Sequence, residues 1–141
     1  LDIVSGAENP RIPEIERWVS QRGNLRVTLN VNPQPVRPIF ANCDLAVMGG
    51  GTTTFEVASC GVPMILLTIA ENQVHQAQGW EERGAAIYLG AYGEVQEKQL
   101  IKSLNMLRLD VARMDRMSEN GTIAVDGCGA MRVAEELITN A

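Results

Sequence analysis

Short apolar runs alternate along the chain with longer segments in which apolar residues recur periodically. The runs are rich in Val, Ile and Leu and lack polar alternation, which is typical of strands buried on both faces of a parallel sheet. The longer segments, bounded by glycines and polar residues, are predicted to be helices. Strands are predicted at residues 2–5, 25–30, 44–48, 64–69 and 86–89, and helices at residues 12–22, 35–42, 52–60 and 72–83.

This alternation of strands and helices is the pattern of a doubly wound α/β fold with right-handed crossovers. We therefore predict a Rossmann-like, mostly parallel sheet of about five strands with helices on both faces. From Val95 onward the pattern is helical to the end of the chain, with interruptions predicted near Asn120 and Gly121 and at residues 127–129. The length of 141 residues fits one domain, so residues 1–141 are predicted to form a single domain.

The stretch MGGGTTTFE, residues 48–56, joins a predicted buried strand to a predicted helix through a glycine turn. Glycines allow a ligand to approach the backbone closely, and a helix start presents unpaired N–H groups that attract phosphate. Gly50, Gly51, Thr52 and Thr53 are therefore candidates to bind a diphosphate. The same pattern also fits a helix that Thr52 or Thr53 merely caps, and Thr53 with Glu56 has the spacing of a capping box.

Polar residues follow the other predicted strands at residues 5–9, 30–32 and 70–73. Ligands of open parallel sheets bind beyond the carboxyl ends of the strands, so we expect donors near Thr52 and Asn72 to face one shared rim. The amides of Asn72 and Gln73 both donate and accept hydrogen bonds, which suits a sugar, although Asn72 also fits a plain helix cap. His75 is interpreted as a bystander, and no catalytic residue or metal site is predicted.

The charge pattern argues against nucleic acid as a partner. The net charge is −5 and the 12 basic residues are scattered, so no nucleic-acid footprint is expected. No apolar run reaches the length that spans a membrane. The three cysteines lie far apart and are odd in number, which fits reduced thiols and a cytoplasmic location.

Residues 43–73, CDLAVMGGGTTTFEVASCGVPMILLTIAENQ, together resemble the nucleotide-binding half of GT-B-type enzymes. The resemblance is to the family that contains the UDP-sugar hydrolase of pseudaminic acid biosynthesis and the spore-coat polysaccharide biosynthesis protein G. Residues 126–133, DGCGAMRV, match a second signature of that group, and Thr52, Phe55 and Glu71 replace its usual Ser, Trp and Asp. A more distant similarity links the same stretch to the peptidoglycan N-acetylglucosaminyltransferase.

The resemblance implies a UDP-sugar-binding domain of a hydrolase that releases an amino or deoxy sugar from UDP in surface-polysaccharide or nonulosonic acid biosynthesis. A glycosyltransferase with a UDP-sugar donor, and a non-catalytic binding subunit that needs a partner chain, remain alternatives. UDP or the UDP-sugar would be the substrate ligand, and no further cofactor is expected. By analogy the diphosphate would contact Gly50, Gly51, Thr52 and Thr53. The ribose would contact Glu56, and the sugar or its phosphate would contact Asn72 and Gln73. The uracil would lie against Val31.

Members of the family also carry an N-terminal domain that supplies the catalytic base, and this chain lacks its counterpart. The chain is therefore expected to be part of a larger two-domain enzyme, inactive by itself, that works with that domain or a partner chain. The family's first strand in this half is missing as well. We expect the first and third strands to pair directly, which gives the order 2-1-3-4-5, unless a partner molecule fills a central gap.

Overall fold

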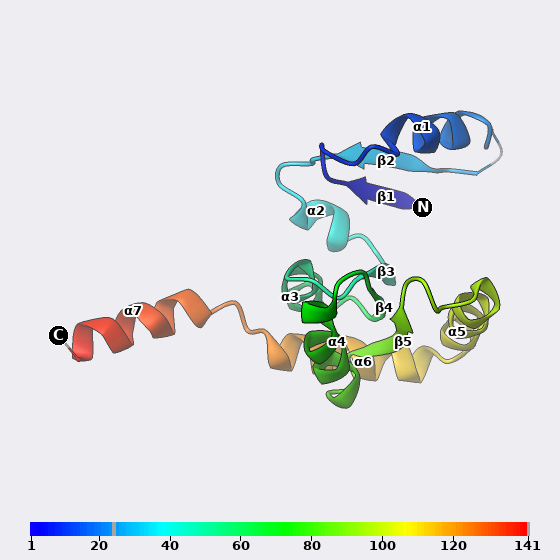
Figure 1. The fold of residues 1–141 in the computed structure, drawn as a ribbon. Coiled ribbons are helices and arrows are strands. Elements are labelled where there is room, and N and C mark those ends of the chain that lie inside the picture. Colours follow the sequence, from blue (N-terminus) through cyan, green and yellow to red (C-terminus); the bar gives the residue numbers. More distant parts are fainter. Residues whose placement is uncertain (24, 141) are drawn as a thin grey trace. The chain divides into compact units, whose positions relative to one another are not determined.

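The computed structural model describes residues 1–23 and 25–140 (Figure 1). Its contacts divide the chain into two compact units, Leu1–Ile39 and Phe40–Ala141, which are described separately below. The short helix α2 (Arg37–Phe40) lies at the boundary between the two units. No helix in the described residues is long and apolar enough to cross a membrane.

Among its described residues, the first unit contains two parallel strands, helix α1 (Ile12–Ser20) and most of the short helix α2. Strand β1 (Asp2–Ser5) pairs with β2 (Thr28–Val31), so that Asp2 lies opposite Thr28 and Ser5 opposite Val31. Helix α1 connects the two strands and contacts β2. It is amphipathic, yet none of its residues is buried.

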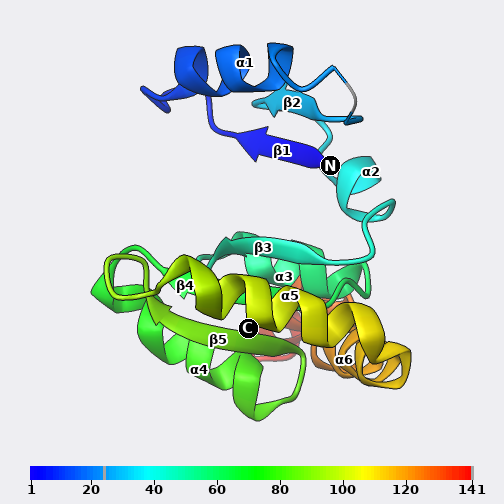
Figure 2. The ribbon, with the colours of Figure 1, turned by 90° about the vertical axis from the view of Figure 1, so that its right-hand side faces the viewer.

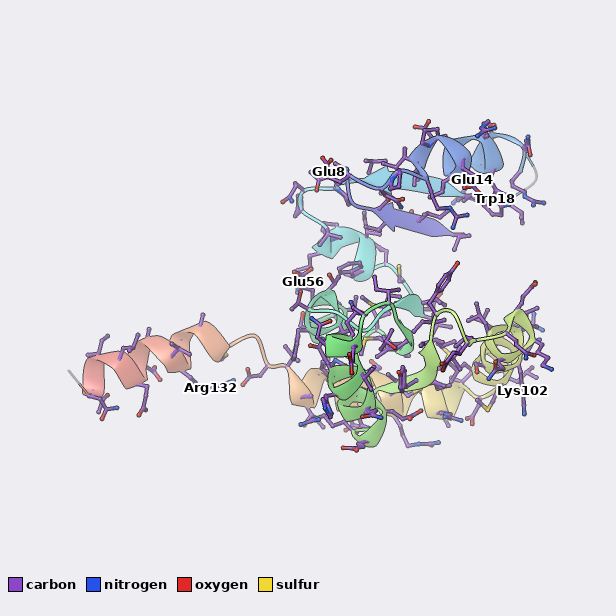
Figure 3. All side chains as sticks on the ribbon, viewed as in Figure 1. Glu8, Glu14, Trp18, Glu56, Lys102 and Arg132 are labelled. Carbon is purple, nitrogen blue, oxygen red and sulfur yellow. The ribbon has the colours of Figure 1, made fainter. Side chains whose placement is uncertain are left out.

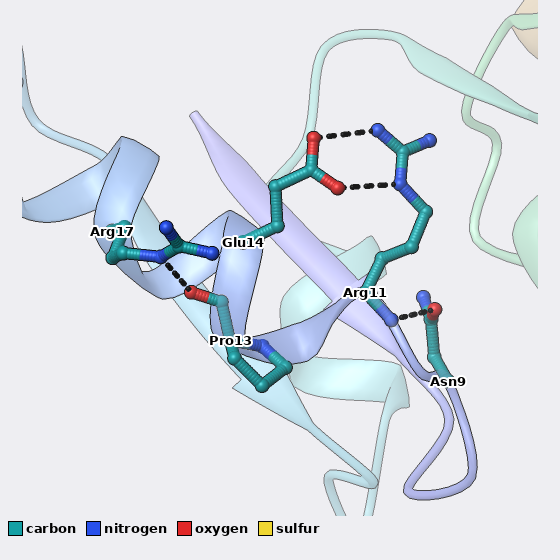
Figure 4. A network of polar contacts seen from close by, with 5 residues as sticks. All are labelled: Asn9, Arg11, Pro13, Glu14 and Arg17. Carbon is teal, nitrogen blue, oxygen red and sulfur yellow. Dashed lines mark hydrogen bonds and ion pairs between the residues drawn. The ribbon is translucent and has the colours of Figure 1, made fainter.

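Surface polar contacts hold the first turn of α1 (Figure 4). The Asn9 side-chain oxygen accepts a hydrogen bond from the backbone N–H of Arg11 at 3.0 Å. The Arg11 guanidinium then donates two hydrogen bonds of 2.9 Å to the Glu14 carboxylate. These bonds and the adjacent positive charge lower the pKa of Glu14. Both side chains are exposed, so the ion pair at this helix start contributes little to the stability of the unit.

The second unit is built on a sheet of three parallel strands in the order β3-β4-β5. Strand β3 (Ala46–Gly49) pairs with β4 (Met64–Thr68), and β4 pairs with β5 (Ala86–Ala91). Met64, Ile65 and Leu66 of the central strand are fully buried. This is the burial that a continuous apolar run in a covered parallel sheet predicts.

Helices cover both faces of this sheet (Figures 1 and 2). Helix α3 (Thr53–Ser59) and helix α4 (Val74–Glu82), which the short 3₁₀ turn η1 (Glu71–Gln73) precedes, contact it on one side. On the other side lie α5 (Glu97–Leu109) and α6 (Val111–Ala124), and helix α7 (Gly129–Thr139) ends the chain. The core between the sheet and α5 and α6 is formed by Ile65, Ile87, Leu107 and Met117.

The predicted α/β fold with parallel strands, helices on both faces and a helical C-terminal part is confirmed. Of the predicted order 2-1-3-4-5, the neighbours β2-β1 and β3-β4-β5 are confirmed, whereas the predicted pairing of β1 with β3 is not formed among the described residues, so that the strands make two sheets. An apolar run specifies that a strand is buried, but it does not specify which strand lies beside it. The prediction that residues 1–141 form a single nucleotide-sugar-binding domain stays a prediction.

The break predicted near Asn120 and Gly121 is also wrong, because α6 continues to Ala124. Gly121 serves close packing there, since a Cβ atom at this position would lie 3.3 Å from the carbonyl oxygen of Ala58 on α3. The helical region breaks instead at Asp110, whose side chain accepts a hydrogen bond from the N–H of Arg113 at 2.9 Å and caps α6. The interruption at residues 127–129 is confirmed.

Candidate functional site

The glycine turn after β3 packs tightly against the start of α4. Gly50 is buried, and a Cβ atom there would lie 3.1 Å from the Cβ of Ala77. Its N–H donates to the carbonyl of Leu67 at 2.9 Å and so continues the hydrogen bonding between β3 and β4. The prediction that Gly50 donates to a diphosphate therefore needs correction, because this donor is already used. Gly50 contributes space for the close approach of the two segments.

The three residues after Gly50 differ from it in the pairing of their backbone N–H groups. Within the described residues the backbone N–H groups of Gly51, Thr52 and Thr53 have no acceptor. Thr52 stands at the N-cap of α3, but its side chain makes no capping hydrogen bond, and both threonines are exposed. The alternative in which Thr52 or Thr53 merely caps the helix is therefore not what the structure shows. The turn keeps unpaired donors at its surface.

Glu56 lies one turn into α3 and is exposed (Figure 3). The capping box that its spacing from Thr53 suggests is not formed, because no hydrogen bond to the carboxylate is present in the described part of the chain. The carboxylate is therefore available to a ligand that offers hydroxyl groups.

Asn72 and Gln73 belong to η1, directly before α4. Asn72 is exposed and is not a helix cap. The side-chain oxygen of Gln73 accepts a hydrogen bond from the N–H of Ile69 at 3.0 Å. Its Nε2 atom lies 3.5 Å from the place where a Cβ atom of Gly51 would be. The glycine turn and the start of α4 thus lie side by side at Gly51 and Gln73, and the prediction that donors near Thr52 and Asn72 face one shared rim stays a prediction.

Three side chains that no sequence pattern singled out connect the start of α3 to α4: Thr54, Gln76 and Trp80. The hydroxyl of Thr54, which is 0% exposed, donates to the carbonyl of Gly51 at 2.7 Å. It accepts hydrogen bonds from Nε2 of Gln76 at 2.7 Å and from Nε1 of Trp80 at 2.9 Å. Gln76 also donates to the carbonyl of Gly51 at 2.6 Å. In the sequence Thr54 appears only as the third of three threonines, so nothing distinguishes it there.

A hollow of about 230 Å³ lies between α3, α4 and the end of α6. Phe55 and Trp80 form part of its lining, with their rings in an edge-to-face contact at 5.3 Å between centroids. His75 and Arg83 line it as well. No group of three or more His, Cys, Asp or Glu side chains within residues 1–23 and 25–140 is placed to hold a metal ion.

Val31 is the last residue of β2 and is 42% exposed. It belongs to the first unit, whereas the glycine turn, Glu56 and Gln73 belong to the second. Its predicted contact with a uracil ring therefore stays a prediction.

Comparisons with known proteins identify the class of fold. No family model matches the chain. The chain is 25% identical over 130 residues to the spore coat polysaccharide biosynthesis protein SpsG of Bacillus subtilis (strain 168), a match that covers 92% of this chain and 38% of that protein. The structure of MurG from Acinetobacter baumannii matches with a TM-score of 0.76 and 17% identity, covering 100% of this chain and 42% of that one. The glycotransferase of kitacinnamycin matches with a TM-score of 0.62 and 25% identity, over 79% of this chain and 29% of that one.

The chain therefore has a GT-B-like, Rossmann-like α/β fold. It spans less than half the length of each of these proteins. The hydrolase that the sequence resemblance favoured finds no support in these matches, whereas the alternative of a glycosyltransferase does.

Proposed function

We propose that this chain is the donor-binding part of a GT-B-like glycosyltransferase and holds the diphosphate of a UDP-sugar at the glycine turn after β3. The observation that carries the proposal is the meeting of Gly51 and Gln73, which brings unpaired donors from two segments to one place. The fold supports it, because the sequence and structure matches include a polysaccharide biosynthesis protein and a glycotransferase.

The donor set suits a diphosphate. Gln73 uses its side-chain oxygen internally and leaves Nε2 as a donor, while Thr52 and Thr53 add hydroxyl and backbone donors. Neutral donors of fixed orientation bind phosphate oxygens and stabilise the charge that grows on them during reaction. Glu56 would accept hydrogen bonds from the ribose hydroxyls, one sugar away from the phosphates, where its charge does not oppose them. Asn72, exposed beside Gln73, would face the transferred sugar.

In the proposed reaction an acceptor hydroxyl attacks the anomeric carbon of the sugar, and the bond from that carbon to the phosphate oxygen breaks. UDP leaves with the electron pair of that bond, and the proton of the acceptor passes to a base. The residues of this chain would bind the departing diphosphate. The base and the acceptor site are proposed to lie in the remainder of a longer protein or in a partner chain.

A titration of the chain with UDP, followed by backbone amide NMR, tests the binding. We expect shifts at residues 51–56 and 72–73, weaker binding of UMP and no preference for NAD. Tighter binding of NAD than of UDP would indicate a dinucleotide site instead. A chain that does not respond to UDP would overturn the proposal.

The variant Gln73→Glu tests the central contact. Glutamate retains an oxygen for the N–H of Ile69 but replaces the Nε2 donor with an acceptor, so UDP should bind about 10- to 100-fold more weakly. Gln78→Glu adds the same charge at an exposed position of α4 and serves as the matched control. Equal losses in the two variants would show that added charge, rather than the lost donor, weakens the complex.

The variant Glu56→Gln separates ribose binding from phosphate binding. It should weaken UDP and uridine alike and leave pyrophosphate affinity unchanged. If pyrophosphate and UDP lost affinity equally, Glu56 would have no contact with the ribose.

A full-length parent protein distinguishes transfer from hydrolysis. Incubated with UDP-N-acetylglucosamine as the probe and without an acceptor, a transferase should release little free sugar. Rapid release of free sugar in water would favour the hydrolase.

A further inference from the structure

The proposed diphosphate site has a buried support beneath it. A hydroxyl group has one hydrogen to donate and two lone pairs to accept with. Thr54 uses all three, toward the Gly51 carbonyl, Gln76 Nε2 and Trp80 Nε1. Thr54 itself is fully buried, and its bond from Trp80 is buried as well, so that this bond is shielded from competing water, whereas the bonds to Gly51 and from Gln76 are part-buried.

The carbonyl of Gly51 is the point that this network fixes. It accepts hydrogen bonds from the Thr54 hydroxyl at 2.7 Å, from Gln76 at 2.6 Å and from the backbone N–H of Thr54 at 3.1 Å, so two side chains from different helices add to the backbone bond that holds this peptide oxygen. In a planar trans peptide the C=O and the following N–H point in opposite directions. Fixing the Gly51 carbonyl toward the interior therefore directs the N–H of Thr52 outward. That N–H has no acceptor among the described residues.

We propose that Thr54, Gln76 and Trp80 are positioning residues that set the affinity of the glycine turn for a diphosphate. The inference rests on the proposed function, since it concerns the same site. Trp80 anchors the network in the core, where it is 4% exposed and packs edge-to-face on Phe55. Gln76 links it to α4, one turn beyond Gln73. A preorganised donor binds phosphate without first reorienting, so the network acts on affinity without touching the ligand.

Three variants measured by calorimetry against UDP and uridine test the inference. Thr54→Val keeps the shape of the side chain and removes the hydroxyl, so UDP should bind about 10- to 100-fold more weakly while uridine is unaffected. Thr54→Ser retains the hydroxyl and should restore UDP affinity to within about twofold of the wild type. Gln76→Met removes the second bond to the Gly51 carbonyl from a half-exposed position, so it provides the same test should Thr54→Val fail to fold.

Two further measurements separate positioning from general loss of stability. The indole N–H resonance of Trp80 should move in Thr54→Val and stay in place in Thr54→Ser, because it reports the bond to the Thr54 hydroxyl directly. Tyr88→Phe removes a comparable hydrogen bond of 3.0 Å, to Thr68, and should lower stability without changing UDP affinity.

The outcomes distinguish the two proposals. If the wild type binds UDP and folded Thr54→Val or Gln76→Met binds it equally well, the positioning role is overturned and the proposed function stands. Parallel loss of UDP and uridine affinity would likewise reduce the network to a structural role. A wild-type chain that binds no UDP would overturn both.

Discussion

The two units of this chain are stabilised in different ways. Among the described residues, every buried hydrophobic side chain belongs to the second unit, from Phe40 to Met117, whereas Ser5 is the buried residue of the first. The second unit has a sheet covered by helices on both faces. The first has two strands and helix α1, which buries none of its residues. The proposed diphosphate site therefore lies entirely on the unit that has a core.

This difference indicates what each unit can do alone. A two-stranded sheet is marginally stable in water unless further strands or helices bury its faces. In the first unit Asn9 donates one part-buried hydrogen bond of 3.0 Å to the Ser5 hydroxyl, whereas Arg22 over the ring of Trp18 at 4.8 Å and Arg11 with Glu14 are exposed contacts. Exposed contacts of this kind contribute little individually. A catalytic or binding site needs fixed geometry, and the buried core of the second unit can supply it.

The difference in stability between the two units should appear most strongly in hydrogen exchange of the backbone amides. Backbone amides of β4 should exchange at least about 100-fold more slowly than those of β1, since opening the second unit exposes its core and opening the first exposes little. Helix α7 sharpens the comparison, because it belongs to the second unit yet buries no residue and should exchange as fast as α1. Equal protection of β1 and β4 would mean that the first unit has stabilising contacts beyond those described.

Truncating one isoleucine in each unit should give the next largest effect. Ile65→Ala removes a fully buried side chain from the core under α5 and α6 and should cost about 2–5 kcal/mol in free energy of unfolding. Ile15→Ala removes a partly exposed side chain of α1 and should cost about 1 kcal/mol or less. Urea unfolding followed by circular dichroism measures both. If Ile15→Ala cost as much as Ile65→Ala, the contrast between the units would be false.

The two units can also be compared by how closely their strands match the ranges predicted from the sequence. Strands of the second unit lie within two residues of their predicted starts and ends, and the central strand β4 is buried as its apolar run indicates. In the first unit the predicted strand 25–30 is displaced, and β2 begins only at Thr28. Strand β1 of the same unit matches its predicted range, residues 2–5, so burial by itself does not decide how closely a strand follows its apolar run.

For the candidate site, the sequence predicts which segments meet but not how their atoms are used. The glycine turn and Gln73 come together as expected, because both follow parallel strands at one edge of a sheet. That the N–H of Gly50 is taken by Leu67 depends on the pairing of β3 with β4. The role of Thr54 depends on its three partners, two of which lie more than 20 residues away. Such bonds are set by tertiary packing, which leaves no local pattern.

The smallest expected effect on stability comes from removing either of two exposed ion pairs, Arg11 with Glu14 in the first unit and Arg132 with Asp126 in the second. Hydrogen bonds from Arg11 lower the pKa of Glu14 in the first unit. Hydrogen bonds from Arg132 and from the N–H of Cys128 lower the pKa of Asp126 at the start of α7. A carboxyl whose pKa is lower in the folded chain adds stability above its unfolded pKa. That contribution is lost as the pH falls through the lowered value.

Carboxyl ¹³C titration should show the pKa of Glu14 rising toward its ordinary value in Arg11→Ala. The pKa of Asp126 should rise only in part in Arg132→Ala, because its bond from the N–H of Cys128 remains. Global unfolding should hardly change in either variant, since both pairs are exposed. Faster amide exchange should appear locally, in α1 or in α7, because neither helix has buried residues to hold it. A drop in the stability of β4 on losing either pair would show that these helices are coupled to the core, and the division drawn from burial would then fail.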